Sequence, residues 1–99
     1  MQKKSDILKY LRSKKDELSS MYGITTLGLY GSYARDEAND KSDIDIFYDT
    51  NNKFNMGILE FSKLKQSFEN DLKAKIDFVS LSSMNPIVKY YAKKDFAYV

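Results

Sequence analysis

This 99-residue chain lacks two residue types that carry much of enzyme chemistry, because it contains no cysteine and no histidine. Without cysteine, neither a disulfide nor a thiolate metal site can form. Without histidine, the serine–histidine and cysteine–histidine nucleophile systems, histidine general bases and most zinc sites are excluded. Any catalysis must therefore use carboxylates, lysines, tyrosines or serines.

Long hydrophobic runs are missing as well. No apolar stretch approaches the roughly 18 to 20 residues that a membrane-spanning helix needs, and residues 1–15 lack the apolar core of a signal peptide. We therefore expect a cytoplasmic protein with no membrane partner. Hydrophobic residues make up 42% of the chain and charged residues 30%, with a single proline, and this composition predicts one globular domain over residues 1–99.

Acidic charge is concentrated in one short segment. The formal net charge is +2, but residues 36–49 contain six acidic residues and only one lysine. The rest of the chain is therefore mildly basic. An acidic pocket on a basic body is typical of a site where metal ions meet phosphate groups.

The order of helical and strand-like segments predicts an α/β (α+β) fold, in which a small mixed sheet of about three to four strands is flanked by helices. Apolar residues at helical spacing predict the helices, and β-branched or alternating residues predict the strands. In chain order we expect a helix capped by Ser5 and ending near Gly23, a strand over 24–30, a short helix within 33–38, a strand over 43–48, a helix over 56–72, a strand over 75–81 and a helix capped by Asn85. The aromatic residues near the C-terminus are expected mainly in the core, with some left exposed for a partner: Tyr90, Tyr91, Phe96 and Tyr98.

Two aspartates begin the second predicted strand. Asp43 and Asp45 alternate with isoleucines, and residues two apart in a strand point to the same face, with α-carbons roughly 6.5 to 7 Å apart. Unpaired acids are costly in a central strand unless they bind metal or reach water. Asp77, between Ile76 and Phe78, is either an exposed strand residue or the third carboxylate of the same site. We predict that Asp43, Asp45 and Asp77 are catalytic and bind Mg²⁺, with two ions expected.

A glycine–serine pair follows the first predicted strand. Glycine permits close backbone approach and a following helix offers free N–H groups, so Gly31 and Ser32 are predicted to hold a triphosphate. Arg35 is a candidate nucleotide contact through phosphate, although it can instead face solvent. Ser42 is a further candidate for the nucleotide site, where it would orient a carboxylate or cap the strand. Either motif alone is common by chance, and the weight of the prediction lies on their combination.

Glycine–serine, ten intervening residues and Asp-x-Asp resemble the signature of the nucleotidyltransferase fold of the DNA polymerase beta superfamily. The alanine–arginine pair at 34–35, the Ser-Asp-x-Asp run from Ser42 and the strand over 76–79 resemble the minimal nucleotidyltransferase, or MntA-type, group over essentially the whole chain. By this resemblance the five matching positions are the phosphate turn, the metal-binding pair and the third acid: Gly31 with Ser32, Asp43 with Asp45, and Asp77.

The resemblance implies a Mg²⁺-dependent enzyme that uses ATP as a substrate. Many members of the group are antitoxins paired with a HEPN-domain ribonuclease toxin, and such an enzyme would inactivate its partner by adding AMP units from ATP to a tyrosine of the toxin. The sequence departs from the pattern at Asp36, where the family often has glycine. This departure puts the local turn and the nucleotide preference in doubt and leaves the acids untouched.

Two other functions stay open on the sequence. One is the same transfer onto a small hydroxylated molecule, against which only the lack of a second domain to hold the acceptor argues. The other is a non-catalytic antitoxin that neutralises its toxin by binding alone. The sequence also leaves open a homo-oligomer or a hetero-oligomer with the toxin.

Overall fold

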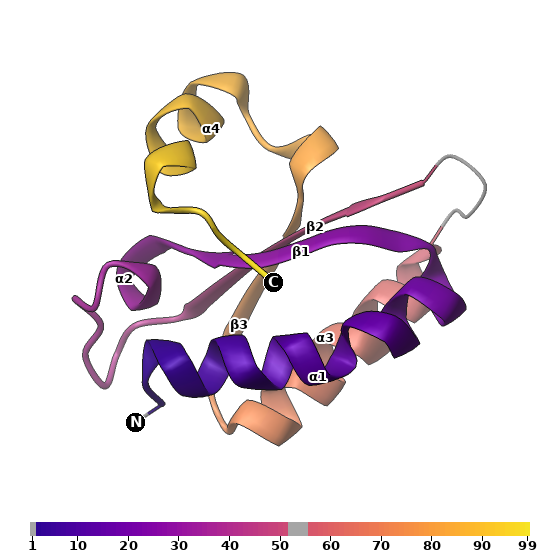
Figure 1. Cartoon of the computed structure of the whole chain (residues 1–99), viewed down its shortest axis with the longest axis horizontal. Helices are drawn as coiled ribbons and strands as arrows, with labels where there is room; N and C mark the ends of the chain where they lie inside the picture. Colours follow the sequence, from indigo (N-terminus) through magenta and orange to yellow (C-terminus); the bar gives the residue numbers. More distant parts are fainter. Residues whose placement is uncertain (1, 52–55) are drawn as a thin grey trace.

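The structure is a computed structural model that describes residues 2–51 and 56–99. Its elements are, in order, α1 (Lys4–Tyr22), β1 (Ile24–Tyr30), α2 (Gly31–Ala34), β2 (Ile44–Thr50), α3 (Ile58–Leu72), β3 (Ile76–Ser80), the 3₁₀ turn η1 (Leu81–Ser83), α4 (Pro86–Ala92), the 3₁₀ turn η2 (Lys93–Asp95) and β4 (Ala97–Tyr98). Four strands form one sheet in the order β3-β2-β1-β4. The predicted mixed sheet flanked by helices is therefore confirmed (Figure 1).

Strand β2 lies between two strands that run in opposite senses. It pairs antiparallel with β1 and parallel with β3, the parallel partner being reached by a crossover through α3. The short β4 joins the outer side of β1, where Gly28 faces Tyr98 and Leu29 faces Ala97. As a result, the N-terminal ends of β2 and β3 lie together beside the C-terminal end of β1.

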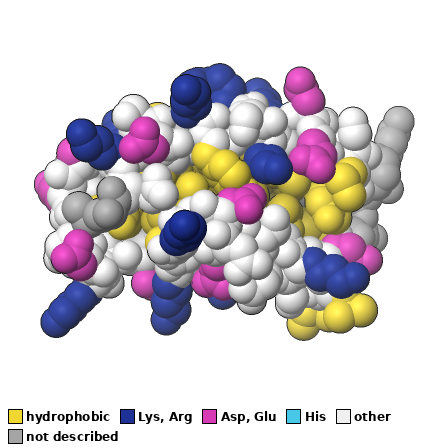
Figure 2. All heavy atoms as spheres, turned by 90° about the horizontal axis from the view of Figure 1, so that it is seen from below, with side chains coloured by type: hydrophobic (Ala, Val, Ile, Leu, Met, Phe, Trp, Pro, Cys, Tyr) yellow, Lys and Arg dark blue, Asp and Glu magenta, His cyan; other side chains and the backbone are white. Residues whose placement is uncertain are grey.

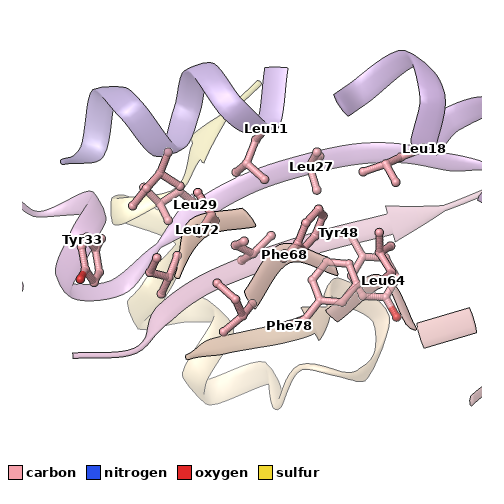
Figure 3. Close-up of a cluster of buried hydrophobic side chains, with 14 of the residues drawn as sticks. Leu11, Leu18, Leu27, Leu29, Tyr33, Tyr48, Leu64, Phe68, Leu72 and Phe78 are labelled. Carbon is pink, nitrogen blue, oxygen red and sulfur yellow. The ribbon is translucent and has the colours of Figure 1, made fainter. Parts of the chain in front are cut away.

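Helices α1 and α3 cover one face of the sheet, the lower face in Figure 1. Their buried side chains recur at helical spacing and meet the apolar side chains that alternate along the strands (Figure 3). Each large side chain buried in this way contributes roughly 1.5 to 3 kcal/mol. The buried residues of the two helices are Ile7, Leu11 and Leu18 from α1 and Leu64, Phe68 and Leu72 from α3.

The side of the two helices that faces solvent carries both signs of charge around a band of apolar side chains (Figure 2). A groove of about 130 Å³ runs between the helices. It is lined by Tyr10 and Met21 of α1 and by Leu64 and Phe68 of α3, among others.

An aromatic cluster occupies the opposite face of the sheet. The ring of Phe47 is fully buried and stacks on Phe96 with a centroid distance of 4.3 Å. Tyr98 meets the same ring edge-on at 5.2 Å, and Tyr30 contacts Phe96 at 5.8 Å. Of the aromatic residues near the C-terminus, Phe96 is half-buried and packs on the buried Phe47, whereas Tyr98 remains 59% exposed.

Two helix starts differ from their predictions. Helix α1 begins at Lys4 with Lys3 as its N-cap, so the prediction of Ser5 as the cap is wrong. The reason is that the Asp6 carboxylate accepts the Lys3 N–H at 3.4 Å and moves the start toward the N-terminus. The short helix expected within 33–38 lies instead at 31–34, and the chain turns away at Asp36, which has a left-handed φ of 57°.

The start of α4 agrees with the sequence, but the helix is not buried in the core. Asn85 caps the helix, since its side-chain oxygen accepts the Ile87 N–H at 2.8 Å. However, none of the seven residues of α4 is buried, and Tyr90 and Tyr91 are among the aromatic residues that stay exposed. No helix within the described ranges is both long and apolar enough to cross a lipid bilayer.

Gly28 provides a test of how closely β4 approaches the sheet. A methyl group at this position would come within 2.3 Å of the Phe47 ring and 2.5 Å of the Ala97 carbonyl oxygen. We expect Gly28→Ala to lower the free energy of unfolding by about 1 to 3 kcal/mol, because β4 must move. Urea denaturation measures the change, and Thr25→Ala, at an exposed position of the same strand, should cost less than about 1 kcal/mol. Equal stabilities of the two variants would contradict this packing.

Candidate active site

Strand register brings two of the three predicted acids together. Asp45 of β2 lies directly opposite Asp77 of β3, and neighbouring strands are about 4.8 Å apart. On its other side Asp45 pairs with Tyr30, the last residue of β1. The side chain of Asp45 is half-buried, whereas that of Asp77 is exposed. One carboxyl group therefore sits inside the site and the other at its entrance.

The glycine–serine turn touches the inner carboxyl group. Gly31 has a left-handed φ of 76°, a conformation that glycine adopts without strain. A methyl group here would come within 2.2 Å of the Asp45 Oδ2 atom, so the carboxylate lies against the bare backbone of the turn. The hydroxyl of the adjacent Ser32 makes no hydrogen bond within the described chain and is free for a ligand.

The paired acids disturb each other's ionisation. Burial raises the pKa of Asp45 to about 6, and Asp77 contributes both by its charge and by a hydrogen bond between the two carboxyl groups. The charge of Asp43 also raises the pKa of Asp45, whereas Arg35 lowers it. Two ionised carboxylates therefore repel each other at the pair, and a bound cation would relieve this repulsion.

The donor set fits a hard cation such as Mg²⁺, because it consists of carboxylate oxygens. Asp43 precedes the first residue of β2 and is half-buried. It acts on Asp45 through its charge. Within residues 2–51 and 56–99, however, no three acidic side chains are gathered tightly enough to enclose an ion. The fit thus rests on the Asp45–Asp77 pair.

Arg35 and Ser42 already have partners in the protein. Arg35 is exposed and forms ion pairs with Glu37 at 2.9 Å and Asp95 at 3.1 Å. The pair with Asp95 ties the end of α2 to η2. The Ser42 hydroxyl accepts the Asn39 N–H at 3.0 Å and closes a turn in the loop before β2. Neither side chain is directed at the acid pair by a hydrogen bond in the described chain.

Tyr30 belongs to the site and was missed from the sequence. Burial raises its pKa to about 12, with Asp77 and Asp45 adding to the shift, so the hydroxyl stays protonated at neutral pH. A protonated phenol beside two carboxylates is a hydrogen-bond donor for them or for a ligand. The signal was available, because Tyr30 directly precedes Gly31 at the end of a predicted strand.

The shifted carboxyl group predicts how stability depends on pH. In the folded state Asp45 takes up a proton near pH 6, but in the unfolded state only near its ordinary value of 3.8. Between these values the folded state binds more protons, so its stability falls as the pH rises through this window. We expect Asp45→Asn to remove this loss and to be more stable than wild type at pH 7.

Urea unfolding at several pH values between 4.5 and 7.5 measures the effect as the difference between wild type and variant. Asp16→Asn serves as the control, because Asp16 is exposed on α1. If the difference in unfolding free energy between wild type and Asp45→Asn did not change between pH 4.5 and 7.5, the pKa of Asp45 would not be raised in the folded state.

Comparisons with known proteins identify the family of the chain. The polymerase beta nucleotidyltransferase family matches residues 3–96. A Methanocaldococcus jannaschii protein, provisionally named a protein adenylyltransferase, is 33% identical over 96% of both chains. The protein adenylyltransferase MntA of Thermococcus cleftensis is 31% identical over 95% of this chain and 93% of its own.

Solved structures share the fold. One, described provisionally as a minimal nucleotidyltransferase, superposes with a TM-score of 0.70 at 25% identity and covers 91% of this chain and 93% of its own. Another contains a tri-AMPylated HEPN toxin of Shewanella oneidensis in complex with MNT antitoxin, with a TM-score of 0.62 at 20% identity over 96% of this chain and 66% of the matched chain. The chain thus has the sequence and the fold of a nucleotidyltransferase, and it belongs to the polymerase beta nucleotidyltransferase family.

Proposed function

We propose that this protein transfers AMP from ATP to a tyrosine hydroxyl of a cognate HEPN ribonuclease toxin, in a Mg²⁺-dependent reaction, and acts as a cytoplasmic antitoxin. The observation that carries the proposal is the pairing of Asp45 with Asp77 against the Gly31 turn. The names of the relatives support AMP and a protein acceptor. The complex of an AMPylated HEPN toxin with MNT antitoxin supports the partner.

Each residue has a proposed role in this reaction. Gly31 and Ser32 hold the triphosphate through the bare turn and the free hydroxyl. Asp43, Asp45 and Asp77 are the proposed Mg²⁺ ligands, and bound Mg²⁺ would neutralise charge on the phosphate oxygens. Ser42 and Arg35 are the remaining proposed nucleotide contacts. Each would contact the nucleotide in addition to, or in place of, its present hydrogen bond or ion pairs within the protein.

Asp77 is the proposed proton acceptor, because it is the exposed member of the pair. The acceptor oxygen attacks the α-phosphorus of ATP and gives its proton to Asp77. The bond from the α-phosphorus to the oxygen that bridges to the β-phosphorus breaks, and pyrophosphate leaves with that oxygen. A new phosphodiester bond joins AMP to the acceptor.

Label transfer tests the proposal. Protein, Mg²⁺, ATP labelled at the α-phosphate and the HEPN protein encoded beside this chain's gene should give a labelled toxin. The double variant Asp43→Ala, Asp45→Ala should lower the rate by about 100-fold or more, because the acids act on the reacting groups. Asp16→Ala, an exposed change on α1, should label at the wild-type rate.

Three results distinguish the alternatives. Equal labelling by the double variant and wild type rules out the assigned site. A double variant that still neutralises the toxin without label favours neutralisation by binding alone. Transfer of label to a small hydroxylated compound, with none to the protein, favours a small-molecule acceptor.

Gly31→Ala tests the geometry of the site, because it changes the position of the Asp45 carboxylate without changing any charge. The added methyl group would push against the Asp45 carboxylate, and the alanine would also have to adopt the left-handed φ of Gly31. We expect a fall in label transfer of roughly 10-fold or more, since small displacements at a reacting centre have large effects on rate. Gly57→Ala, at a glycine on the N-terminal side of α3, is the control and should transfer at the wild-type rate. Wild-type transfer by Gly31→Ala would show that the turn does not position Asp45.

A further inference from the structure

Helix α4 presents an apolar surface that the rest of the described chain leaves uncovered. Ile87 is 69% exposed and Tyr91 67%, and Val88 and Tyr90 are exposed as well. The helix stands on the open side of the sheet, away from α1 and α3 (Figure 1). Adjacent exposed apolar side chains on a short helix are typical of a surface that binds another molecule.

The helix is nevertheless held in place at both ends. Met84, directly before the helix, is buried, and the ion pair between Arg35 and Asp95 ties the following η2 turn to α2. Just beyond, Phe96 stacks on the buried Phe47. The exposed face is therefore presented in a fixed position relative to the site, which reduces the ordering cost of binding.

A hollow of about 510 Å³ joins this helix to the candidate active site. The active-site side supplies Tyr30, Gly31 and Arg35 as part of its lining, and α4 supplies Ile87, Val88 and Tyr91. Because Gly31 also touches the Asp45 carboxylate, a molecule seated on α4 lies next to the reacting groups.

We propose that α4 and this hollow are the docking surface for the acceptor protein, an inference that rests on the proposed function. The hollow reaches Gly31, against which the Asp45 carboxylate lies, so a docked chain can offer a hydroxyl to the neighbouring Asp77. Its lining includes Lys94, which has no ion pair in the described residues, whereas the other charged lining residues, Arg35 and Asp95, are paired with each other. The fitting partner is thus a protein segment that combines apolar and acidic side chains.

The double variant Ile87→Ser, Val88→Ser tests the docking surface. Both side chains are exposed, so the fold should be retained. We expect the KM for the HEPN protein to rise by roughly tenfold or more, with kcat at saturation nearly unchanged, because only acceptor binding is lost. Calorimetry should show the same loss in the Kd for the HEPN protein, and the Kd for AMP-PNP should stay at the wild-type value.

A matched pair on the other side of the molecule supplies the control. Ile58 and Leu59 are 83% and 69% exposed at the start of α3, and the double variant Ile58→Ser, Leu59→Ser should bind and label the HEPN protein as wild type does. An equal loss in both double variants, or no loss in the α4 variant, would overturn the docking surface.

The other occupants of the hollow give different results, each of which overturns the docking surface. A parallel loss of AMP-PNP affinity would assign the hollow to the nucleotide. A wild-type dimer that becomes monomeric in the α4 variant, with an unchanged KM, would assign the surface to a second copy of the chain. Failure of wild type to bind the HEPN protein would also overturn it.

Failure of the proposed function looks different. If wild type binds the HEPN protein through α4 but does not label it, the docking surface stands and the chemistry is wrong.

Discussion

The position of β2 between an antiparallel and a parallel neighbour is the constraint on which the site depends. Its register with β3 sets Asp45 opposite Asp77, and its register with β1 sets Asp45 beside Tyr30 and the Gly31 turn. Every group of the candidate site then lies at one end of the sheet. The register itself is secured by burial, because a slip of one residue would turn Ile44 and Ile46 away from the core.

The two faces of the sheet pack against different parts of the chain. Apolar side chains of α1 and α3 bury the face of the sheet that these helices cover (Figure 3). On the other face, Phe96 stacks on the buried Phe47, while Asp45 is half-buried and Asp77 exposed. The acids on this side are therefore accessible to a ligand.

The site holds neighbouring carboxyl groups that repel each other, an arrangement that a purely structural sheet would avoid. Burial and the neighbouring carboxyl groups raise the pKa of Asp45, while Arg35, the basic group that opposes this, is engaged by Glu37 and Asp95. Such unrelieved charge in a sheet is typical of a group kept for function. The ion pair between Arg35 and Asp95 holds the η2 turn that directly follows α4, so one side chain links the site to the exposed helix.

The sequence by itself determined the elements that depend on local chemistry. The alternation of Asp43 to Tyr48 predicted a strand, Asn85 predicted a helix start, and the glycine–serine and Asp-x-Asp pair predicted the site, because these signals lie within a few residues. Only the tertiary structure decided what depends on residues far apart. It added Tyr30 to the acids through strand pairing, and it gave Arg35 a partner sixty residues away. It also left the apolar stripe of α4 uncovered, since periodicity shows which face is apolar but not what packs against it.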